Sequence, residues 1–219
     1  MIMLAAGPVE TFDEKDLVAR LVNDNKALWN KLLQNNFCQK QMKTQSATDQ
    51  KTLDGFKWYM RQDFLYITKL GIYEANRGLK ATNTQDFETS MDRVGKCAKY
   101  AKDHLKMCTT TPPNGLGIEE STILATPETK ALQQYVALLL DAADKENWVM
   151  SAVAMIPCIQ SYYLIAEDLY RNSVHKDTPW HKLWTEENVK YKSSTERQKS
   201  GYPRCAIRQK INQLPSSIL

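Results

Sequence analysis

Glycine and proline are scarce in this chain of 219 residues, which holds eight of each. Both residues interrupt helices, so their scarcity leaves room for long ones. Apolar residues recur at helical intervals, and alternating β-branched runs are few. The composition, 42% hydrophobic and 25% charged, is that of a globular protein, and the length suits one domain with a substantial core. The sequence therefore predicts an all-α protein.

Long apolar stretches and export signals are absent as well. No window approaches the ~18 uninterrupted apolar residues of a membrane-spanning helix. Residues 1–8 have neither a basic segment nor a long apolar one. The five cysteines are odd in number and form no Cys-x-x-Cys pair, which argues against a secreted disulfide framework. We therefore expect a cytoplasmic protein that does not bind a membrane.

Histidine is rare, and its three positions argue against several cofactors. His104, His175 and His181 lie far from the first helix, so a haem ligand there is missing. No Glu-x-x-His pair favours a di-iron bundle, and no His-Glu-x-x-His, P-loop or Gly-x-Gly-x-x-Gly motif occurs. These absences disfavour a haem protein, a di-iron bundle and the nucleotide-binding classes. A Ser-His-Asp triad stays open, although no motif favours it.

The excess of positive charge is confined to the end of the chain. Residues 189–219 hold seven lysines and arginines and one acidic residue, so the net charge of +4 leaves residues 1–188 with a net −2. Basic tails are usually solvated segments, and no nucleic-acid-binding motif accompanies this one. We therefore expect no nucleic-acid partner.

Apolar periodicity and capping residues define five helices. Thr11 and Glu14 have capping-box spacing at the first of them. Thr126 and Pro127 have the pattern of an N-cap followed by proline at the first helical position. The expected helices cover residues 13–34, 50–76, 86–107, 127–144 and 148–170, separated by a linker at 35–47 and a loop at 109–117. After Trp184 we expect regular structure to fade.

Residues 148–170 form the most apolar segment, and a helix that is apolar on most sides belongs at the centre of a bundle. Pro157 lies inside it, at a cost of ~3 kcal/mol in a helix interior, and such violations of local preference are often functional. Cys158 follows directly. A thiol beside a bend can face a cavity and act as a nucleophile once a donor or charge activates it. The alternative is a cysteine that merely packs.

Asp63 is the second candidate, because it lies in an aromatic and apolar stretch with Tyr59 and Phe64. A buried carboxylate must be paired or ligand-bound, since its isolated burial is costly. A carboxyl group has two oxygens side by side and suits two-point hydrogen bonding with the amino and ring-nitrogen edge of an aminopyrimidine. The alternative is a carboxylate on the helix surface near Lys69 or Arg61.

Four tyrosines accompany these candidates. Tyr66 follows the aspartate by three residues, and Tyr135 lies on the helix between the two segments. Tyr162 and Tyr163 follow the cysteine. Flat rings stack on flat ligands, and a phenol hydroxyl can hydrogen-bond a thiolate. Ordinary core packing is the alternative for all four.

Two runs in this chain resemble signatures of the TenA, or thiaminase II, family. Residues 56–66 carry Tyr-x-x-Gln-Asp-x-x-Tyr, and residues 154–163 carry Pro-Cys-x-x-x-Tyr. Tyr135 stands 23 residues before Cys158, where the family has a tyrosine that faces the cysteine. The resemblance extends over roughly residues 26–184.

The resemblance implies a haem-oxygenase-like helical bundle that assembles as a homotetramer and needs no metal or organic cofactor. Family members hydrolyse an aminomethyl-aminopyrimidine, a breakdown product of thiamin, and some cleave thiamin at the same methylene bridge. The presence of Cys158 points to the cysteine-bearing branch. The implied function is that of a hydrolase in thiamin metabolism whose partner is a small aminopyrimidine or thiamin.

By resemblance, Asp63 binds the amino group and ring nitrogen of the pyrimidine. Cys158 attacks the ring to give a covalent adduct that expels the exocyclic amine or the thiazole, and water releases the hydroxymethyl product. Tyr135 and Tyr162 orient the thiol, and Tyr66 lines the pocket. The catalytic candidates are thus Cys158, Asp63 and Tyr135.

The end of the chain departs from the family. Asn188 stands near the position of a family tyrosine, and similarity stops near residues 191–197. Family members end in a long helix whose glutamate protonates the leaving group, whereas residues 198–219 are basic, broken by proline and free of acidic residues. We therefore predict a TenA-like domain over residues 1–197, a divergent tail over 198–219 and a bundle without its normal last helix.

This departure leaves two hypotheses beside the hydrolase. The missing glutamate favours a pyrimidine-binding or structural paralogue that has lost catalysis. The scarcity of histidine opposes a haem- or cofactor-dependent oxidase on the same fold. Whether Glu186 or Glu187 reaches the pocket of Cys158 decides if another carboxylate takes the place of the glutamate.

Overall fold

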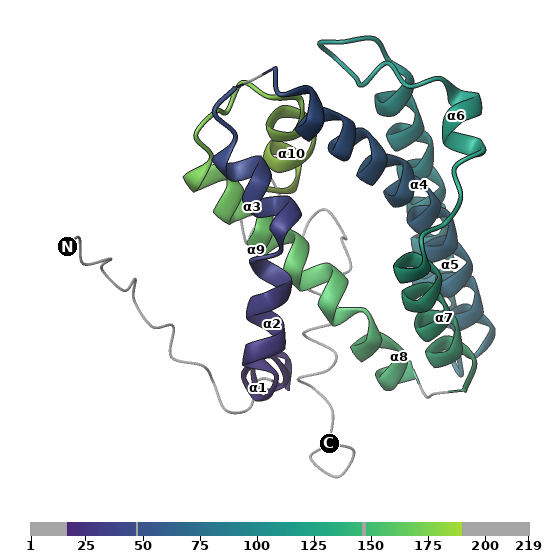
Figure 1. The fold of residues 1–219 in the computed structure, drawn as a ribbon. Helices are drawn as coiled ribbons and strands as arrows, with labels where there is room; N and C mark the ends of the chain where they lie inside the picture. Colours follow the sequence, from purple (N-terminus) through teal and green to yellow (C-terminus); the bar gives the residue numbers. More distant parts are fainter. Residues whose placement is uncertain (1–16, 47, 146–147, 190–219) are drawn as a thin grey trace.

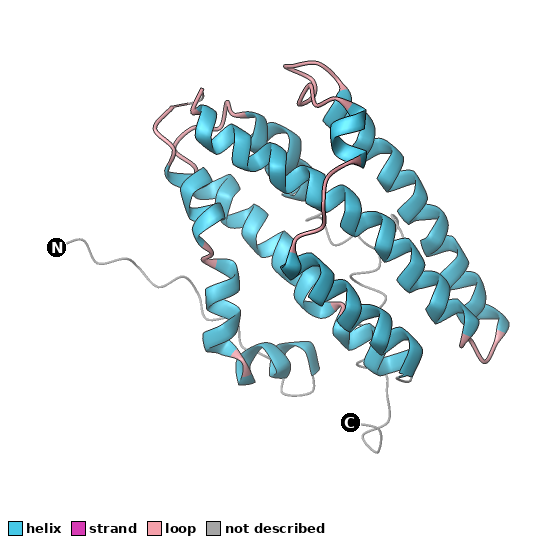
Figure 2. Ribbon diagram, turned by 45° about the vertical axis from the view of Figure 1, so that its right-hand side comes forward, coloured by secondary structure: helices cyan, strands magenta, loops and turns pink. Residues whose placement is uncertain are grey.

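The computed structural model describes residues 17–46, 48–145 and 148–189, and most of these residues are helical (Figure 2). No strand occurs within these ranges, as the all-α prediction requires, and none of their helices is both long and apolar enough to cross a membrane. In chain order the elements are α1 (Leu17–Asp24), α2 (Lys26–Leu33), α3 (Asn36–Lys43), α4 (Gln50–Leu79), α5 (Thr84–Thr109), α6 (Glu120–Leu124), α7 (Lys130–Lys145), α8 (Trp148–Ala154), α9 (Ile156–Asn172), the π-helix η1 (His181–Thr185) and α10 (Glu186–Val189).

The long helices α4 and α5 pack along each other, and α7 packs against α4 beside them (Figure 1). Polar caps start both long helices: Asp49 accepts a hydrogen bond from the backbone of Thr52, and Asn83 accepts one from Asp86. Both helices match the predicted ranges to within three residues at each end. Their boundaries follow the sequence because capping and apolar periodicity are local properties.

The main core packs around an apolar stripe on α4. Phe56, Met60 and Phe64, each separated by about one helical turn, are buried. They share one cluster with Leu169 of α9 and with Trp180, which directly precedes η1. α9 in turn contacts α2, α3, η1 and α10, and these helices form the second half of the molecule in Figure 1.

The first two predicted segments differ from the structure. The expected helix at 13–34 is interrupted at Asn25, whose side chain bonds back to the carbonyl of Leu21, and residues 13–16 lie outside the described ranges. The expected linker at 35–47 is wrong, because α3 occupies most of it. Asn35 caps α3 by accepting from the backbone of Cys38, and Phe37 packs on the core.

The predicted helix start at Thr126 is also wrong. Residues 126–129 are not helical, and α7 begins at Lys130. The side chain of Gln62 holds this stretch through both of its amide atoms, donating to the carbonyl of Pro127 at 2.8 Å and accepting from the backbone N–H of Thr129 at 2.9 Å. A pair of long-range hydrogen bonds has therefore overridden a good local capping pattern.

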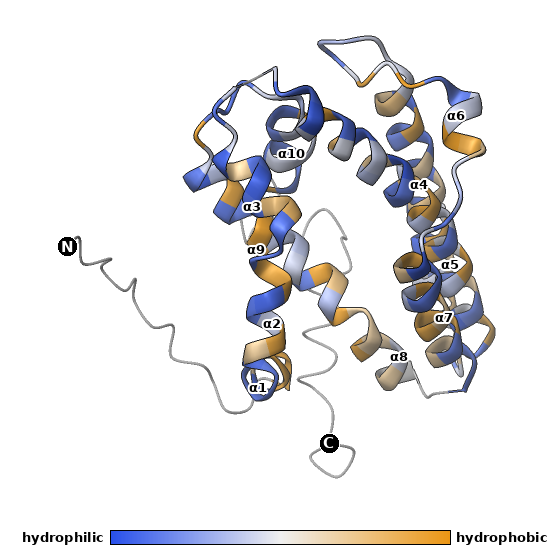
Figure 3. Ribbon diagram, in the orientation of Figure 1, coloured by the Kyte–Doolittle hydropathy of each residue, from blue (hydrophilic) through white to orange (hydrophobic). Residues whose placement is uncertain are grey.

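The apolar segment at 148–170 forms two helices instead of one. α8 ends at Ala154, and α9 begins at Ile156 with Pro157 in its first turn. Proline is well tolerated there, so the predicted energetic cost is wrong, whereas the helix is interrupted close to the predicted position, at Met155. Figure 3 shows α8 and the start of α9 in pale and orange tones, which agrees with the apolar character expected of the segment.

Regular structure continues beyond the point where we expected it to fade. Trp180 and Trp184 are buried, and the chain stays helical through η1 and α10 to Val189. The tail at 198–219, the domain boundary at 197 and the question of a last helix lie outside the described residues.

Candidate active site

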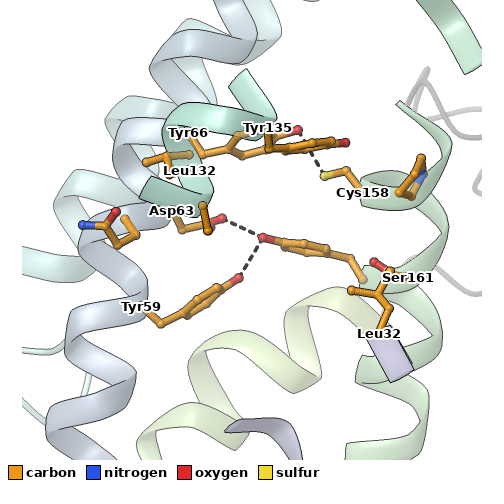
Figure 4. A pocket seen from close by; sticks show the side chains of 12 residues that line it. Leu32, Tyr59, Asp63, Tyr66, Leu132, Tyr135, Cys158 and Ser161 are labelled. Carbon is orange, nitrogen blue, oxygen red and sulfur yellow. Dashed lines mark hydrogen bonds between the residues drawn. The ribbon is translucent and has the colours of Figure 1, made fainter. Parts of the chain in front are cut away.

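A pocket of about 350 Å³ lies between α4 and α7 on one side and α9 and α2 on the other (Figure 4). Its lining residues are Leu32, Tyr59, Gln62, Asp63, Tyr66, Ala131, Leu132, Tyr135, Pro157, Cys158, Ser161 and Tyr162. All five predicted site residues are among them. Tyr163, the fourth tyrosine considered, is not.

Asp63 ends a directional chain of hydrogen bonds. The indole N–H of Trp184 donates to the hydroxyl of Tyr59 at 3.1 Å, Tyr59 donates to Tyr162 at 3.0 Å, and Tyr162 donates to Oδ1 of Asp63 at 2.9 Å. An indole can only donate, so it fixes the direction of the chain. Each donor therefore points toward the carboxyl group, which suits its ionised form.

Burial controls the protonation of this chain. Burial raises the pKa of Asp63, while the positive charge of His104 and the hydrogen bond from Tyr162 oppose the rise. Burial and the charge of Asp63 raise the pKa values of Tyr59 and Tyr162 well above the usual value. Both phenols therefore stay protonated and serve as donors at neutral pH.

The surface alternative for Asp63 is wrong, because its side chain is buried. The two cations considered as its partners lie elsewhere. Lys69 pairs with Glu128 at 3.5 Å, and the guanidinium of Arg61 lies over the ring of Trp58.

Cys158 lies in the first turn of α9, where the helix dipole favours negative charge. The hydroxyl of Tyr66 donates to its Sγ atom at 3.2 Å. The ring of Tyr66 stacks on that of Tyr135, with centroids 6.0 Å apart. Burial, followed by the charge of Cys158, raises the pKa of Tyr66, so this phenol remains a donor to sulfur.

The hydrogen-bond partners of two tyrosines differ from those implied by the resemblance. Tyr66 contacts the thiol, whereas it was expected only to line the pocket. Tyr162, expected at the thiol, bonds to Asp63. Tyr135 donates to the carbonyl of Ala154 at 3.4 Å and also interacts with Cys158, beside which it was expected. Tyr66 reaches the sulfur because it lies one turn after Asp63, so both side chains project from the same face of α4.

Three residues around Asp63 were not among the predicted site residues. Gln62 lines the pocket, Trp184 starts the hydrogen-bond chain, and His104 places Nδ1 3.8 Å from Oδ2 of Asp63. Gln62 had a signal, since it belongs to the run at 56–66. His104, a single histidine on the buried face of α5, had no such signal in the sequence.

No second carboxylate lines the pocket in the described part of the chain. Glu186 and Glu187 are not lining residues, and the side chain of Asn188 donates to the carbonyl of Trp184. The described residues also contain no group of three or more His, Cys, Asp or Glu side chains arranged to hold a metal ion.

Replacing Gln62 by alanine is expected to lower the free energy of unfolding by about 1–2 kcal/mol, because two buried or half-buried backbone contacts are lost. The start of α7, which carries Tyr135, should loosen with it. Urea denaturation measures the effect, with the exposed Gln134→Ala on α7 as the matched control. Equal stability of the two variants would show that Gln62 does not hold the segment.

A family model matches most of this chain. Residues 45–208 match the model of the TENA/THI-4/PQQC family. An uncharacterised protein of Haemophilus influenzae is 25% identical over 150 residues, which are 68% of this chain and 65% of that protein. The chain thus spans just under two thirds of the length of this curated relative.

Two solved structures are similar in fold. A TenA family transcription regulator from Silicibacter sp. TM1040 has a TM-score of 0.68 at 16% identity, over 89% of this chain and 78% of its own. The TenA homologue protein from P. horikoshii OT3 has a TM-score of 0.68 at 23% identity, over 91% and 85%. At such identities the similarity concerns the fold, which is the all-α, haem-oxygenase-like fold of TenA proteins.

Proposed function

This chain belongs to the TENA/THI-4/PQQC family, and from that premise we propose that it hydrolyses an aminopyrimidine at the exocyclic methylene, with Cys158 as nucleophile, in thiamin salvage. One observation carries the proposal: the carboxyl of Asp63 and the thiol of Cys158 line the same tyrosine-walled pocket.

The size and lining of the pocket support a ligand of this class. Its volume of about 350 Å³ is at the small end of ligand pockets, typically about 300–1,000 Å³, and suits one six-membered ring with short substituents. The stacked rings of Tyr66 and Tyr135 offer a flat wall. Leu32 and Leu132 keep the pocket largely apolar, so the hydrogen bonds to Asp63 determine the orientation of the ring.

In the proposed reaction, the Cys158 sulfur bonds to a ring carbon next to a ring nitrogen. The C=N electron pair moves to that nitrogen, and the thiol proton passes to the exocyclic amine, which leaves as ammonia. Water then adds its oxygen at the methylene, and its remaining proton returns to sulfur as the C–S bond breaks. The hydrogen bond from Tyr66 stabilises the sulfur whenever it carries negative charge.

The single carboxylate in the described lining favours a second candidate function. Without a second acid the leaving group lacks a proton donor, at a cost of roughly 10²–10⁴-fold in rate. A family member that binds an aminopyrimidine without turning it over fits the same pocket.

Purified protein separates the two functions. We expect ammonia release from the aminomethyl-aminopyrimidine and heat of binding for the hydroxymethyl product. Binding without ammonia release would favour the second candidate, and the absence of binding would contradict both.

Asp63→Ala should weaken binding of the hydroxymethyl-aminopyrimidine about 10²-fold, because a site built to bond polar edges loses its acceptors. Calorimetry measures the change. Ser161→Ala removes another polar side chain from the lining and serves as the matched control, with an expected change of at most a few-fold. Similar affinities for the two variants would refute the assignment of Asp63.

A further inference from the structure

We propose that His104 is a positioning residue that shares one proton with Asp63, so that the pair offers an aminopyrimidine one donor and one acceptor. His104 does not line the pocket, and it acts through Asp63. The ligand class rests on the proposed function, whereas the pairing itself rests on geometry alone.

The tautomer of His104 follows from its partner on α4. The side chain is buried on α5, and its Nε2 atom lies 2.8 Å from the carbonyl oxygen of Met60. A carbonyl oxygen only accepts, so Nε2 must carry a hydrogen. Met60 precedes Asp63 by one turn of α4, and this bond therefore aims the other ring nitrogen at the carboxyl group.

Nδ1 of His104 and Oδ2 of Asp63 must hold one proton between them. Nδ1 faces Oδ2 of Asp63 at 3.8 Å and has no hydrogen-bond partner among the described residues. If neither atom carried a proton, two acceptors would face each other in a buried site, which is costly. One proton therefore resides on Nδ1 or on Oδ2, and an approach of about 1 Å brings the two atoms to hydrogen-bonding distance.

Ionisable groups on three helices surround this pair. Tyr59 and Tyr66 on α4, Tyr162 on α9, and Tyr100 and Cys108 on α5 are the ionisable groups that face it. Burial raises the pKa of Cys108 to about 12 and those of Tyr59, Tyr66 and Tyr162 well above the usual value. These four stay protonated near neutral pH. The ring of His104 is further held between Phe64 and Tyr100.

The shared proton has a use in the proposed reaction. The edge of an aminopyrimidine has one acceptor, the ring nitrogen, and one donor, the amino group. With the proton on Oδ2, Asp63 donates to the ring nitrogen and accepts from the amino group. When sulfur adds to the ring, the nitrogen takes this proton, and it returns the proton to Asp63 when the amine leaves. Proton number is conserved over the cycle.

The first test uses two variants that differ in which ring nitrogen they imitate. In His104→Gln the amide N–H can replace Nε2 toward Met60, but nothing replaces Nδ1. We expect kcat for the aminomethyl-aminopyrimidine to fall about 10²-fold with KM changed only a few-fold. The alkaline limb of the pH profile should move to lower pH, because the proton that the reaction needs then resides on Asp63 alone, whose carboxyl loses it more readily than the pair does.

His104→Asn, which places an amide near Nδ1, should recover part of the rate. His181→Gln is the matched control, since His181 is buried away from the pocket, and its pH profile should equal that of the wild type. A profile for His104→Gln that superimposes on the wild type would overturn the proposal, because a merely structural role leaves it unchanged.

The second test needs neither activity nor a folded variant of His104. Nitrogen NMR of the histidine rings in the wild type should show a protonated Nε2 for His104 and a titration at Nδ1 that changes in Asp63→Asn. A bare Nε2, or the same titration in both proteins, would overturn the pairing. If the pairing is present but the hydroxymethyl-aminopyrimidine does not bind, the proposed function fails and the pairing stands. If the protein turns over the substrate but the ring signals of His104 do not respond to Asp63→Asn, the pairing fails and the proposed function stands.

Discussion

Replacing Cys158 by serine is expected to lower ammonia release from the aminomethyl-aminopyrimidine by about 10³-fold or more, because a hydroxyl is a far poorer nucleophile than a thiolate. Serine keeps the size of the side chain and can still accept from Tyr66. Asp63 is unchanged, so the affinity for the hydroxymethyl product should stay within a few-fold of the wild type. Steady-state kinetics and calorimetry on the same preparation separate the two effects.

The control for this experiment is a cysteine in a different environment. Cys97 on α5 does not line the pocket, and burial together with the charge of Glu74 raises its pKa to about 11. Cys97→Ser should therefore keep full activity. Full activity in Cys158→Ser would remove the nucleophile from the proposal and leave only the binding site.

The effect is large because the other described thiols cannot substitute for Cys158. Burial raises the pKa of Cys38 and raises that of Cys108 to about 12, so both remain thiols at neutral pH. Neither lines the pocket. Among the described cysteines only Cys158 combines access to the pocket, a hydrogen-bond donor and a helix N-terminus.

Glu74→Gln is expected to cost about 3–5 kcal/mol of the free energy of unfolding, the usual cost of breaking a buried ion pair. Oε2 of Glu74 lies 2.9 Å from Arg77 and 3.7 Å from Arg93, and all three side chains are almost fully buried between α4 and α5. Removing the carboxylate leaves two buried guanidinium groups without the negative charge they both contact. Thermal and urea unfolding measure the loss, which corresponds to roughly 10 °C in Tm for a domain of this size.

Glu88→Gln is the matched control, because Glu88 is exposed on α5 and its loss should change stability by no more than about 0.5 kcal/mol. Arg77 also donates to the hydroxyl of Ser151 on α8 at 3.1 Å, so this cluster supports the helix that leads into Cys158. A loss of less than about 1 kcal/mol in Glu74→Gln would mean that water or rearrangement compensates the buried charges.

Local sequence determined the two long helices and the identity of the candidate residues. α4 and α5 follow from caps at Asp49 and Asn83 and from an apolar repeat, which act within a few residues of where they stand. Asp63 and Cys158 stood out because their chemistry contrasts with apolar neighbours. The sequence could also show their order along the chain, which is the basis of the family resemblance.

The tertiary structure alone decided what each of these residues contacts. Tyr66 donates to the thiol and Tyr162 donates to the carboxyl group. The packing of α4 against α9 determines which of these side chains meet. Gln62 prevented a helix at Thr126, and His104 came to lie behind Asp63, through contacts between residues 40 or more positions apart. Periodicity and capping report on a single element, whereas hydrogen bonds between elements depend on their packing, which no local pattern encodes.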